Sequence, residues 1–215
     1  MRCDTCHFQF NNNASDRRKH RIFHDRFVNG IAWKPHPREQ IIFSAKDFRL
    51  IWITGKSPSL LRKRAEKLAN LANRETQFDC VVYSGKTVHQ AALIAIFENR
   101  AIGIMVLEPT RKLWKGTWKD IQQSHHRAWR NSHPTEHTGC SYLWVALKFR
   151  GQEWAWKMAN AACRQLHVSR EDLPWMPPFT EGGKGFLKKY CPRQITLGWV
   201  DEERKIFIRG DDSDA

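Results

Sequence analysis

The sequence predicts an α/β fold of the α+β kind, in which a mixed, largely antiparallel sheet carries helices and a small ββα module precedes it. Short apolar runs typical of strands are interspersed with segments whose apolar residues recur at helical spacing. Cysteines and histidines near the N-terminus have the spacing of a metal-binding ββα module. We therefore expect a zinc finger over 1–38, a main domain over 39–200 and an acidic tail over 201–215.

Composition excludes two broad classes of protein. No apolar run approaches the roughly 20 residues that a membrane-spanning helix needs. Ten Trp and twelve Phe among 215 residues are too many for a chain that never collapses. The N-terminus lacks the apolar core of a secretory signal, so we expect an intracellular protein, cytoplasmic or, in a eukaryote, nuclear. No membrane partner is expected, and the oligomeric state is left open.

The net charge is +14, from 36 Lys and Arg against 22 Asp and Glu. Such a field attracts anions, which include nucleic acid, phosphates and acidic proteins. The last fifteen residues hold six acidic and three basic side chains, so the positive charge belongs to the rest of the chain. Charge alone does not choose among these partners.

The N-terminal module has the pattern C-x2-C-x13-H-x3-H, formed by Cys3, Cys6, His20 and His24. Two cysteines separated by two residues present both thiolates to one ion, and two histidines four residues apart lie on one helix face. This donor set suits tetrahedral Zn(II). A peptide this short cannot bury a core, so the metal is expected to supply much of its folding free energy.

Between the two ligand pairs, Phe8 and Phe10 alternate with polar residues as a short strand does, and 11–13 reads as a turn. Asp16 is placed to begin the helix that carries both histidines. That helix is basic and suits phosphate contact, although a docking or structural role is favoured because a single finger reads only about three base pairs. Its basic residues are Arg17, Arg18, Lys19, Arg21 and Arg26.

The first half of the main domain reads as strands around one helix, after a boundary at 36–39. The helix begins near Pro58 and runs to about Asn73, with Leu61, Ala65 and Leu68 on one face. The turn at 99–100 leads into a strand that Glu108 and Pro109 are expected to end. The predicted strands are 40–44, 50–54, 80–83, 91–98 and 101–107.

Residues 111–138 are rich in Trp, Arg and His and read as an insertion. The favoured interpretation is an amphipathic helix whose Trp residues pack on the body of the protein. The alternative is a segment that faces a substrate or a nucleic acid, where Trp stacks and Arg pairs with phosphate. Four histidines in the segment have no persuasive metal-binding spacing, and we do not predict a second metal site there.

An apolar strand at 141–147 leads through a short basic loop into a helix that ends near Leu166. Loop amides and a helix N-terminus that converge after a strand form a common cradle for a pyrophosphate. Connections between strands and helices are frequent, so this signal is weak by itself.

Taken together, these pieces resemble the cohesin acetyltransferase family, which joins a C2H2 zinc finger to an acetyltransferase domain of the GNAT type. The finger matches at its four ligands, at Asp16 and at Gly30. The strand Ser141-Tyr-Leu-Trp-Val resembles the family's S-R-I-W-V. Further matches are Phe23, Phe27, Trp33, Gly103, Glu108, Pro109, Arg150, Ala155, Met158, Thr180, Gly183, Lys184, Phe186, Tyr190 and Cys191.

The resemblance implies an acetyl-CoA site built from this strand and the loop after it. The strand should hold the pantetheine arm and polarise the thioester carbonyl, and the loop should hold the pyrophosphate with Arg150. The family usually has Gly where this chain has Glu153, whose carboxylate could repel the pyrophosphate while Gly151 relieves the backbone instead. The implied residues are Trp144, Val145, Ala146, Leu147, Arg150, Gly151, Gln152, Glu153, Trp154 and Ala155.

The family's catalytic carboxylates fall on Asn160 and Pro178, neither of which can act as a base. Acetyl transfer needs a neutral amine, and a lysine has a pKa near about 10.4, so another group must take the proton. Ser141 matches the family serine of its strand. The remaining catalytic candidates are Ser141, Glu181, Glu171 and Asp172, with Glu108 less favoured.

Two functions follow from this reading. The favoured one is an acetyl-CoA-dependent N-acetyltransferase acting on a protein lysine, with a structural Zn(II). The alternative is a catalytically degenerate relative that binds nucleic acid or a protein through the finger helix and the insertion. The finger begins at Cys3, so a stand-alone relative without the family's long N-terminal extension is expected.

Overall fold

A computed structural model describes residues 1–76, 83–86, 89–123 and 132–199. The chain forms two compact units, which are described separately. The first holds Met1–Leu107 and Tyr142–His167, and the second holds Glu108–Ser141 and Val168–Ala215. Two long strands, β5 (Arg100–Gly116) and β6 (His133–Val145), contribute residues to both units. Among the described residues, no helix has the length and apolar character needed to cross a bilayer.

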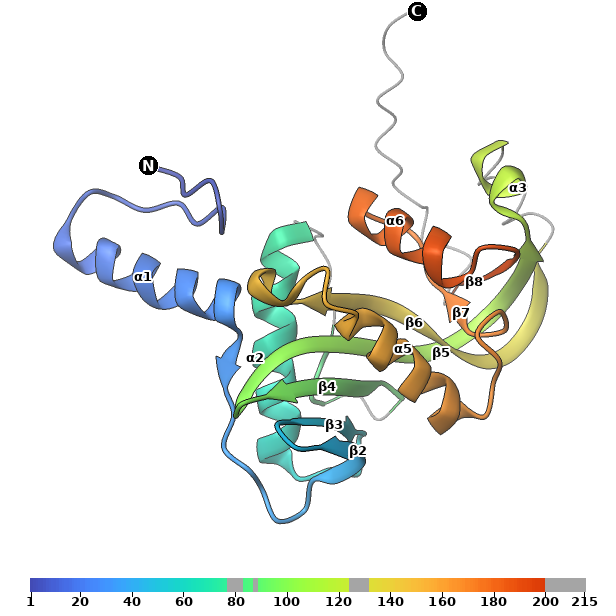
Figure 1. Ribbon diagram of the computed structural model, residues 1–215, viewed down its shortest axis with the longest axis horizontal. Helices are drawn as coiled ribbons and strands as arrows, with labels where there is room; N and C mark the ends of the chain where they lie inside the picture. The colour runs from blue at the N-terminus through green and yellow to red at the C-terminus, as the bar shows by residue number, and fades with distance from the viewer. Residues whose placement is uncertain (77–82, 87–88, 124–131, 200–215) are drawn as a thin grey trace, which may run out of the picture. The chain divides into compact units, whose positions relative to one another are not determined.

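The sheet of the first unit has the strand order β2-β3-β4-β5-β6, with a two-residue strand β1 (Ile31–Ala32) paired to β5 (Figure 1). The pairs β2/β3, β3/β4 and β4/β5 are antiparallel. Strand β4 is buried along its centre because both of its faces are covered. The other strands here are β2 (Gln40–Ala45), β3 (Phe48–Ile53) and β4 (Ala91–Phe97).

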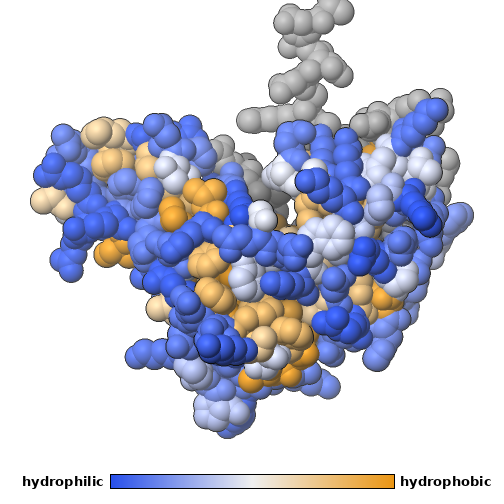
Figure 2. Space-filling view, in the orientation of Figure 1, coloured by the Kyte–Doolittle hydropathy of each residue, from blue (hydrophilic) through white to orange (hydrophobic). Residues whose placement is uncertain are grey.

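Two helices pack on opposite faces of this sheet, α2 (Ser59–Thr76) and α5 (Trp154–Leu166) (Figure 1). Their apolar faces follow the predicted spacing: Leu61, Ala65 and Leu68 of α2 are buried, as are Met158 and Ala162 of α5. Both predicted helices are confirmed, although α2 continues three residues beyond Asn73. The edge strand β2 is exposed, and hydrophobic residues gather over β2 and β3 (Figure 2).

The finger helix α1 (Ala14–Asn29) begins one residue after its cap, Asn13. The Asn13 side chain accepts a hydrogen bond from the backbone N–H of Asp16 at 2.8 Å. The expectation that Asp16 begins the helix is therefore wrong by a few residues: Asp16 lies in the first turn, where its carboxylate suits the helix dipole and accepts from the Asn11 amide. The helix ends at Gly30, where φ is +78°.

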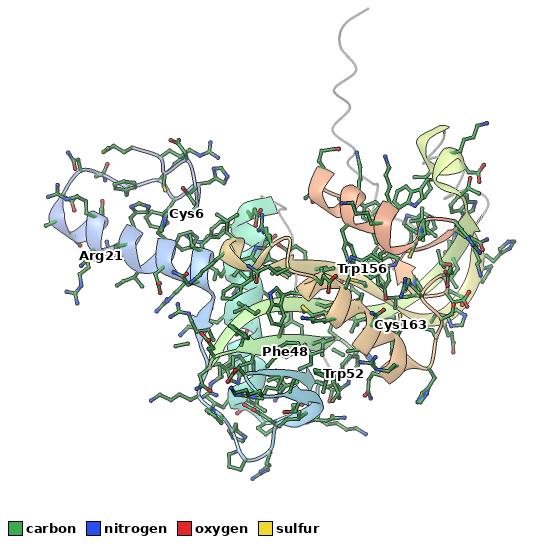
Figure 3. All side chains as sticks on the ribbon, viewed as in Figure 1. Cys6, Arg21, Phe48, Trp52, Trp156 and Cys163 are labelled. Atoms are coloured by element: carbon green, nitrogen blue, oxygen red, sulfur yellow. The ribbon has the colours of Figure 1, made fainter. Side chains whose placement is uncertain are left out.

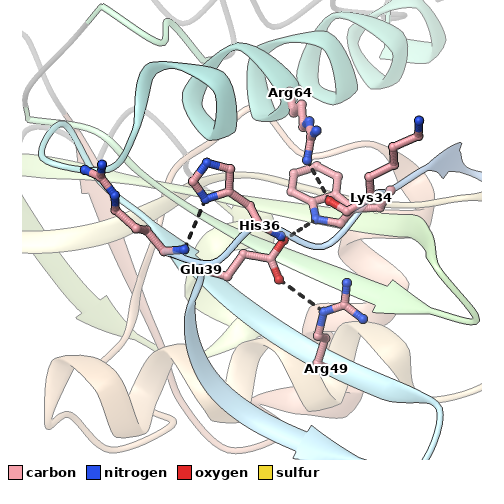
Figure 4. A network of polar contacts seen from close by, with 7 residues as sticks. Lys34, His36, Glu39, Arg49 and Arg64 are labelled. Atoms are coloured by element: carbon pink, nitrogen blue, oxygen red, sulfur yellow. Dashed lines mark hydrogen bonds and ion pairs between the residues drawn. The ribbon is translucent and has the colours of Figure 1, made fainter.

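The segment after the finger is held to the sheet by the carboxylate of Glu39, whose side chain is only 4% exposed (Figure 4). Glu39 accepts from the Trp33 indole at 2.8 Å and from Arg49 Nε of β3 at 3.3 Å. Arg64 of α2 donates to the Lys34 carbonyl and lies over the Trp33 ring. The predicted boundary at 36–39 thus lies in a segment that is hydrogen-bonded to helix α2 and to strand β3 within the first unit.

In the second unit β8 (Ile195–Trp199) pairs with β7 (Pro174–Trp175) and with the distal part of β5. The pairs β6/β7 and β7/β8 are parallel, so the sheet is mixed as predicted. Helix α6 (Glu181–Tyr190) begins after Thr180, whose hydroxyl accepts from the Gly183 amide at 3.1 Å. Phe186 and Tyr190 of α6 pack on Trp175 of β7.

The expected strand end at Pro109 is wrong, because β5 runs on to Gly116. Among the described residues, β4 pairs with β5 as far as Leu107, and β8 pairs with β5 from Lys112 onward. Pro109 lies between these two ladders and is paired with neither β4 nor β8 among the described residues, so its missing N–H removes no hydrogen bond to either strand. A proline inside a strand is therefore tolerated here.

The amphipathic helix favoured for 111–138 is also wrong over most of its length. The described part of this segment contains the end of β5, the short helix α3 (Trp118–Gln123) and the beginning of β6. Part of it, 124–131, lies outside the described residues, as do the acidic tail 201–215 and most of the predicted strand 80–83. Tyr83 is described and is not in a strand.

Candidate functional site

The four predicted metal ligands come together at the finger. One ligand atom from each of Cys3, Cys6, His20 and His24 lies within 4.8 Å of all the others. The Sγ atom of Cys3 is 3.5 Å from Nδ1 of His24. The Nε2 atom of His20 is buried and has no hydrogen-bond partner among the described residues. Two sulfurs and two imidazole nitrogens at this spacing fit one tetrahedral ion. Such an ion would also give the buried Nε2 atom of His20 a partner.

The two thiols have different environments. Burial opposes ionisation of Cys3, but donors from the backbone of Cys6 and Thr5 and from both histidines lower its pKa to about 6. Burial raises the pKa of Cys6, and the neighbouring Cys3 thiolate raises it further. A metal ion reverses the preference at Cys6, because coordination favours the thiolate. Figure 3 shows Cys6 on the loop beside α1 and Arg21 on the helix itself.

The C-terminal half of the finger helix packs against the sheet of the first unit and is hydrogen-bonded to it. The Phe27 ring is 1% exposed and packs on Trp144 of β6, with ring centroids 6.1 Å apart. Arg100 of β5 donates to the carbonyls of Asn29 and Gly30 and to the carboxylate of Asp25. A Cβ at Gly30 would lie 2.3 Å from the Ala101 carbonyl oxygen, so only glycine fits this approach.

The predicted acetyl-CoA loop lies between the end of β6 and the first turn of α5. A short 3-10 helix, η1 (Leu147–Phe149), follows Ala146, and Arg150 ends it. Gly151 and Glu153 both have positive φ, +75° and +64°. Gly151 therefore does not relieve the backbone at Glu153, which occupies the left-handed region itself. The side chains of Gln152 and Glu153 are exposed beside the N-terminus of α5.

Arg150 has partners inside the first unit. Its Nη1 donates to Oε1 of Glu75 at 2.7 Å, its Nη2 donates to Oε2, and its Nε donates to the Val145 carbonyl at 2.9 Å. The indole of Trp144 donates to the same carboxylate at 2.8 Å. Sequence reasoning missed Glu75 because the helix that carries it was expected to end at Asn73.

Trp154 anchors the first turn of α5. Its ring contacts Phe48 at 4.8 Å and Phe97 at 5.3 Å between centroids, and Lys157 lies 4.4 Å from its centroid. Its indole donates to the Gln152 side chain at 3.3 Å. In the predicted strand, the Ala146 amide is already bonded to the Ile102 carbonyl at 2.7 Å and is therefore not free to polarise a thioester.

The catalytic candidates all lie in the second unit, whereas the loop lies in the first. The Oγ atom of Ser141 is buried and has no partner among the described residues. Asp172 accepts from Lys115 at 2.6 Å and from Ser169, and these contacts lower its pKa. Lys184 likewise lowers the pKa of Glu181, whose side chain is 89% exposed. Glu171 uses its backbone carbonyl to accept from Thr196.

Comparison with known proteins agrees with the motifs. No protein-family model matches the chain. The chain is 24% identical over 205 residues to the N-acetyltransferase ESCO2 of Danio rerio and 24% identical over 202 residues to human ESCO2. Each match covers 88% of this chain, which spans about a third of the length of these relatives.

Solved structures give the same result for the fold. The xEco2 acetyltransferase domain bound to a K105-CoA conjugate has a TM-score of 0.60 and 23% identity, covering 76% of this chain and 99% of that one. The same domain in another structure has a TM-score of 0.57 and 19% identity, covering 78% and 100%. The fold is thus a mixed α/β fold like that of the xEco2 acetyltransferase domain, and the chain is homologous to the N-acetyltransferase ESCO2.

Proposed function

We propose that this protein is an acetyl-CoA-dependent N-acetyltransferase that acetylates a lysine of a protein by direct attack of the amine on the thioester. The observation that carries the proposal is the loop 150–155. It follows a buried strand, has two positive φ angles and ends at the N-terminus of the thirteen-residue helix α5. Homology to ESCO2 supports the same activity, and one xEco2 structure holds a CoA conjugate.

The loop offers backbone amides to an anion. The first amides of a helix have no intrahelical acceptor, and the helix dipole favours negative charge beside them. Gly151, Gln152 and Glu153 are exposed, so a pyrophosphate can approach their backbone. The negative charge of the Glu153 carboxylate opposes this role, so Glu153 is the residue to test first.

For proton movement we propose the residues that the sequence suggested. We propose that the hydroxyl of Ser141, which is buried and has no hydrogen-bond partner among the described residues, donates a hydrogen bond to the leaving thiolate. Asp172 is held ionised by Lys115, and Glu181 by Lys184. Glu171 completes the set of carboxylates that can accept the amine's proton, either directly or through a water.

Zn(II) at Cys3, Cys6, His20 and His24 would be structural. All four protein ligands close a tetrahedral shell, which leaves no position for a substrate. When bound, the ion supplies folding free energy to a segment whose own buried side chains are few. With the ion bound, the four ligands would hold the loop 1–10 against α1, and α1 in turn contacts Trp144 through Phe27.

The test combines binding and turnover. We expect acetyl-CoA to bind the purified chain in a calorimetric titration and to transfer its acetyl group to a lysine-containing protein, detected as a 42 Da mass increase per lysine, about the mass of one acetyl group added for one hydrogen. Ser141→Ala should keep the binding and lower kcat. No heat with acetyl-CoA at high micromolar concentration would overturn the proposal.

A second candidate is a binding protein that keeps the fold without catalysis. Four arginines of α1 favour it, because Arg17, Arg18, Arg21 and Arg26 are exposed along the finger helix. Asn160 and Pro178 at the family's catalytic positions agree with it. The expected result is a duplex-DNA affinity that falls steeply with salt and is reduced in Arg18→Ala and Arg21→Ala. DNA affinity independent of salt would contradict phosphate contact.

A further inference from the structure

Glu75 lies near the C-terminal end of α2 and belongs to none of the motifs that the sequence offers. Its carboxylate nevertheless accepts hydrogen bonds from both parts of the predicted acetyl-CoA site, the strand and the loop. The Trp144 indole, from strand β6, donates to Oε2, and Arg150, from the loop, donates to both oxygens. The side chain is only 27% exposed, so the three donors bind one carboxylate that is largely shielded from water.

The guanidinium of Arg150 is thereby held by two acceptors. Glu75 holds the two terminal nitrogens, and the Val145 carbonyl accepts from Nε at 2.9 Å. A guanidinium has five N–H donors in a rigid plane, so two remain, one on each terminal nitrogen. The Arg150 side chain is 39% exposed, which leaves these donors open to a ligand. An arginine held in this way loses less conformational entropy on binding an anion than an unrestrained one.

We infer that Glu75 is a positioning residue that orients Arg150 toward the pyrophosphate of acetyl-CoA. The inference rests on the proposed function, because it names the anion that Arg150 meets. Glu75 itself does not touch the ligand. Its negative charge weakens the attraction of Arg150 for an anion, but the pair is partly exposed and this attraction is screened by water. Orientation of the planar donors is therefore the larger effect.

The structure supplies a matched control in the same unit. Glu39 also accepts from one Trp indole and one arginine, Trp33 and Arg49, and in addition from the His36 amide, but it holds the segment after the finger (Figure 4). Glu39→Gln and Glu75→Gln therefore make the same chemical change in two similar triads. Only Glu75 contacts a residue of the loop 150–155.

The test is a double-mutant cycle on the dissociation constant for acetyl-CoA, using Glu75→Gln, Arg150→Ala and the combination. We expect Glu75→Gln to weaken binding by about tenfold, as misplacement of a charge-assisted donor does. In the Arg150→Ala background the same change should have no further effect, because Glu75 acts only through Arg150. Glu39→Gln should leave the affinity within about twofold, since it changes nothing at the loop.

A second readout does not depend on the cofactor. In the unaltered chain the Nε–H of Arg150 should give a single, slowly exchanging NMR signal, and in Glu75→Gln that signal should broaden or exchange faster. Equal or tighter acetyl-CoA affinity in Glu75→Gln, or an equal loss in the Arg150→Ala background, would overturn the inference and leave the proposed function standing. Failure of the unaltered chain to bind acetyl-CoA would overturn both.

Discussion

The ring of Phe27, on the finger helix, lies against the ring of Trp144, on strand β6, with centroids 6.1 Å apart. Trp144 also donates its indole hydrogen to Glu75, which holds Arg150. A single side chain, Trp144, thus lies between the finger helix and the carboxylate that binds Arg150 of the proposed acetyl-CoA loop. This contact makes the finger part of the packing of the first unit.

We expect Phe27→Ala to destabilise the protein by about 3–5 kcal/mol, the range for removing a buried Phe. Phe27 is 1% exposed, so the substitution leaves a cavity against Trp144. Urea unfolding followed by tryptophan fluorescence measures the change. Ile22→Ala is the control on the same helix: Ile22 is 44% exposed, and its loss should change stability by no more than about 0.5 kcal/mol.

Removal of the metal should unfold the metal-binding part of the finger and leave the sheet and the C-terminal half of α1 largely intact. We expect about one equivalent of zinc in the purified protein, because a complete Cys2His2 set binds one ion. Cys6→Ser should lose the metal together with the helical circular dichroism of the N-terminal half of α1, because Phe27 and Arg100 hold the C-terminal half without it. His7→Asn is the control, since His7 has a positive φ of 54° that Asn tolerates and is not in the ligand set. Full zinc occupancy in Cys6→Ser would contradict this assignment.

Glu153→Gly should stabilise the fold by about 1 kcal/mol, because a non-glycine residue in the left-handed region is strained by roughly that amount. It should also tighten acetyl-CoA binding if the carboxylate repels the pyrophosphate. Glu153→Gln separates the two effects, since it removes the charge and keeps the backbone strain. Melting temperature and calorimetric affinity are measured for both variants. Equal affinities in all three proteins would exclude repulsion by Glu153.

Asp172 should titrate with a pKa below the ordinary value for aspartate, because Lys115 and Ser169 donate to it. Its folded pKa lies below its unfolded pKa, so the Lys115–Asp172 pair stabilises the fold above the unfolded value. That contribution is lost as the pH falls through the folded value. Asp172 is 52% exposed, so the contribution should be only a few tenths of a kcal/mol.

The measurement for Asp172 is carboxyl-carbon NMR as a function of pH. Lys115→Ala should return the pKa of Asp172 toward its ordinary value, while the neighbouring Lys112→Ala should shift it much less. A pKa of Asp172 that does not respond to Lys115→Ala would show that the ion pair does not form in solution.

Local patterns predicted the helices and the metal ligands well. The spacing of Leu61, Ala65 and Leu68 gave the buried face of α2, and the four ligands converge as their spacing indicated. Long strands were the main failure. Pro109 suggested a strand end, because the sequence does not show that β4 stops pairing before it and β8 starts after it. Pairing between distant strands is a tertiary property that no local window contains.

The site was predictable only in part, for the same reason. The order of strand, loop and helix from Ser141 to Leu166 was visible in the sequence. The partner of Arg150 was not, because Glu75 lies 75 positions away along the chain and only the fold brings the two together. The Ala146 amide was expected to face the thioester but donates to Ile102, which depends on the register of β6 against β5.

The bonding of Glu39 bears on how this protein can be divided. The histidine and prolines at 35–37 look like a cutting point between two modules, yet the segment is tied to α2 and β3 by Arg64 and Arg49. A truncation that begins at residue 40 would remove the Glu39 carboxylate that pairs with Arg49 and the buried Trp33 ring that lies against Arg64. We therefore expect a fragment that begins at residue 40 to be less stable than one that keeps residues 33–39.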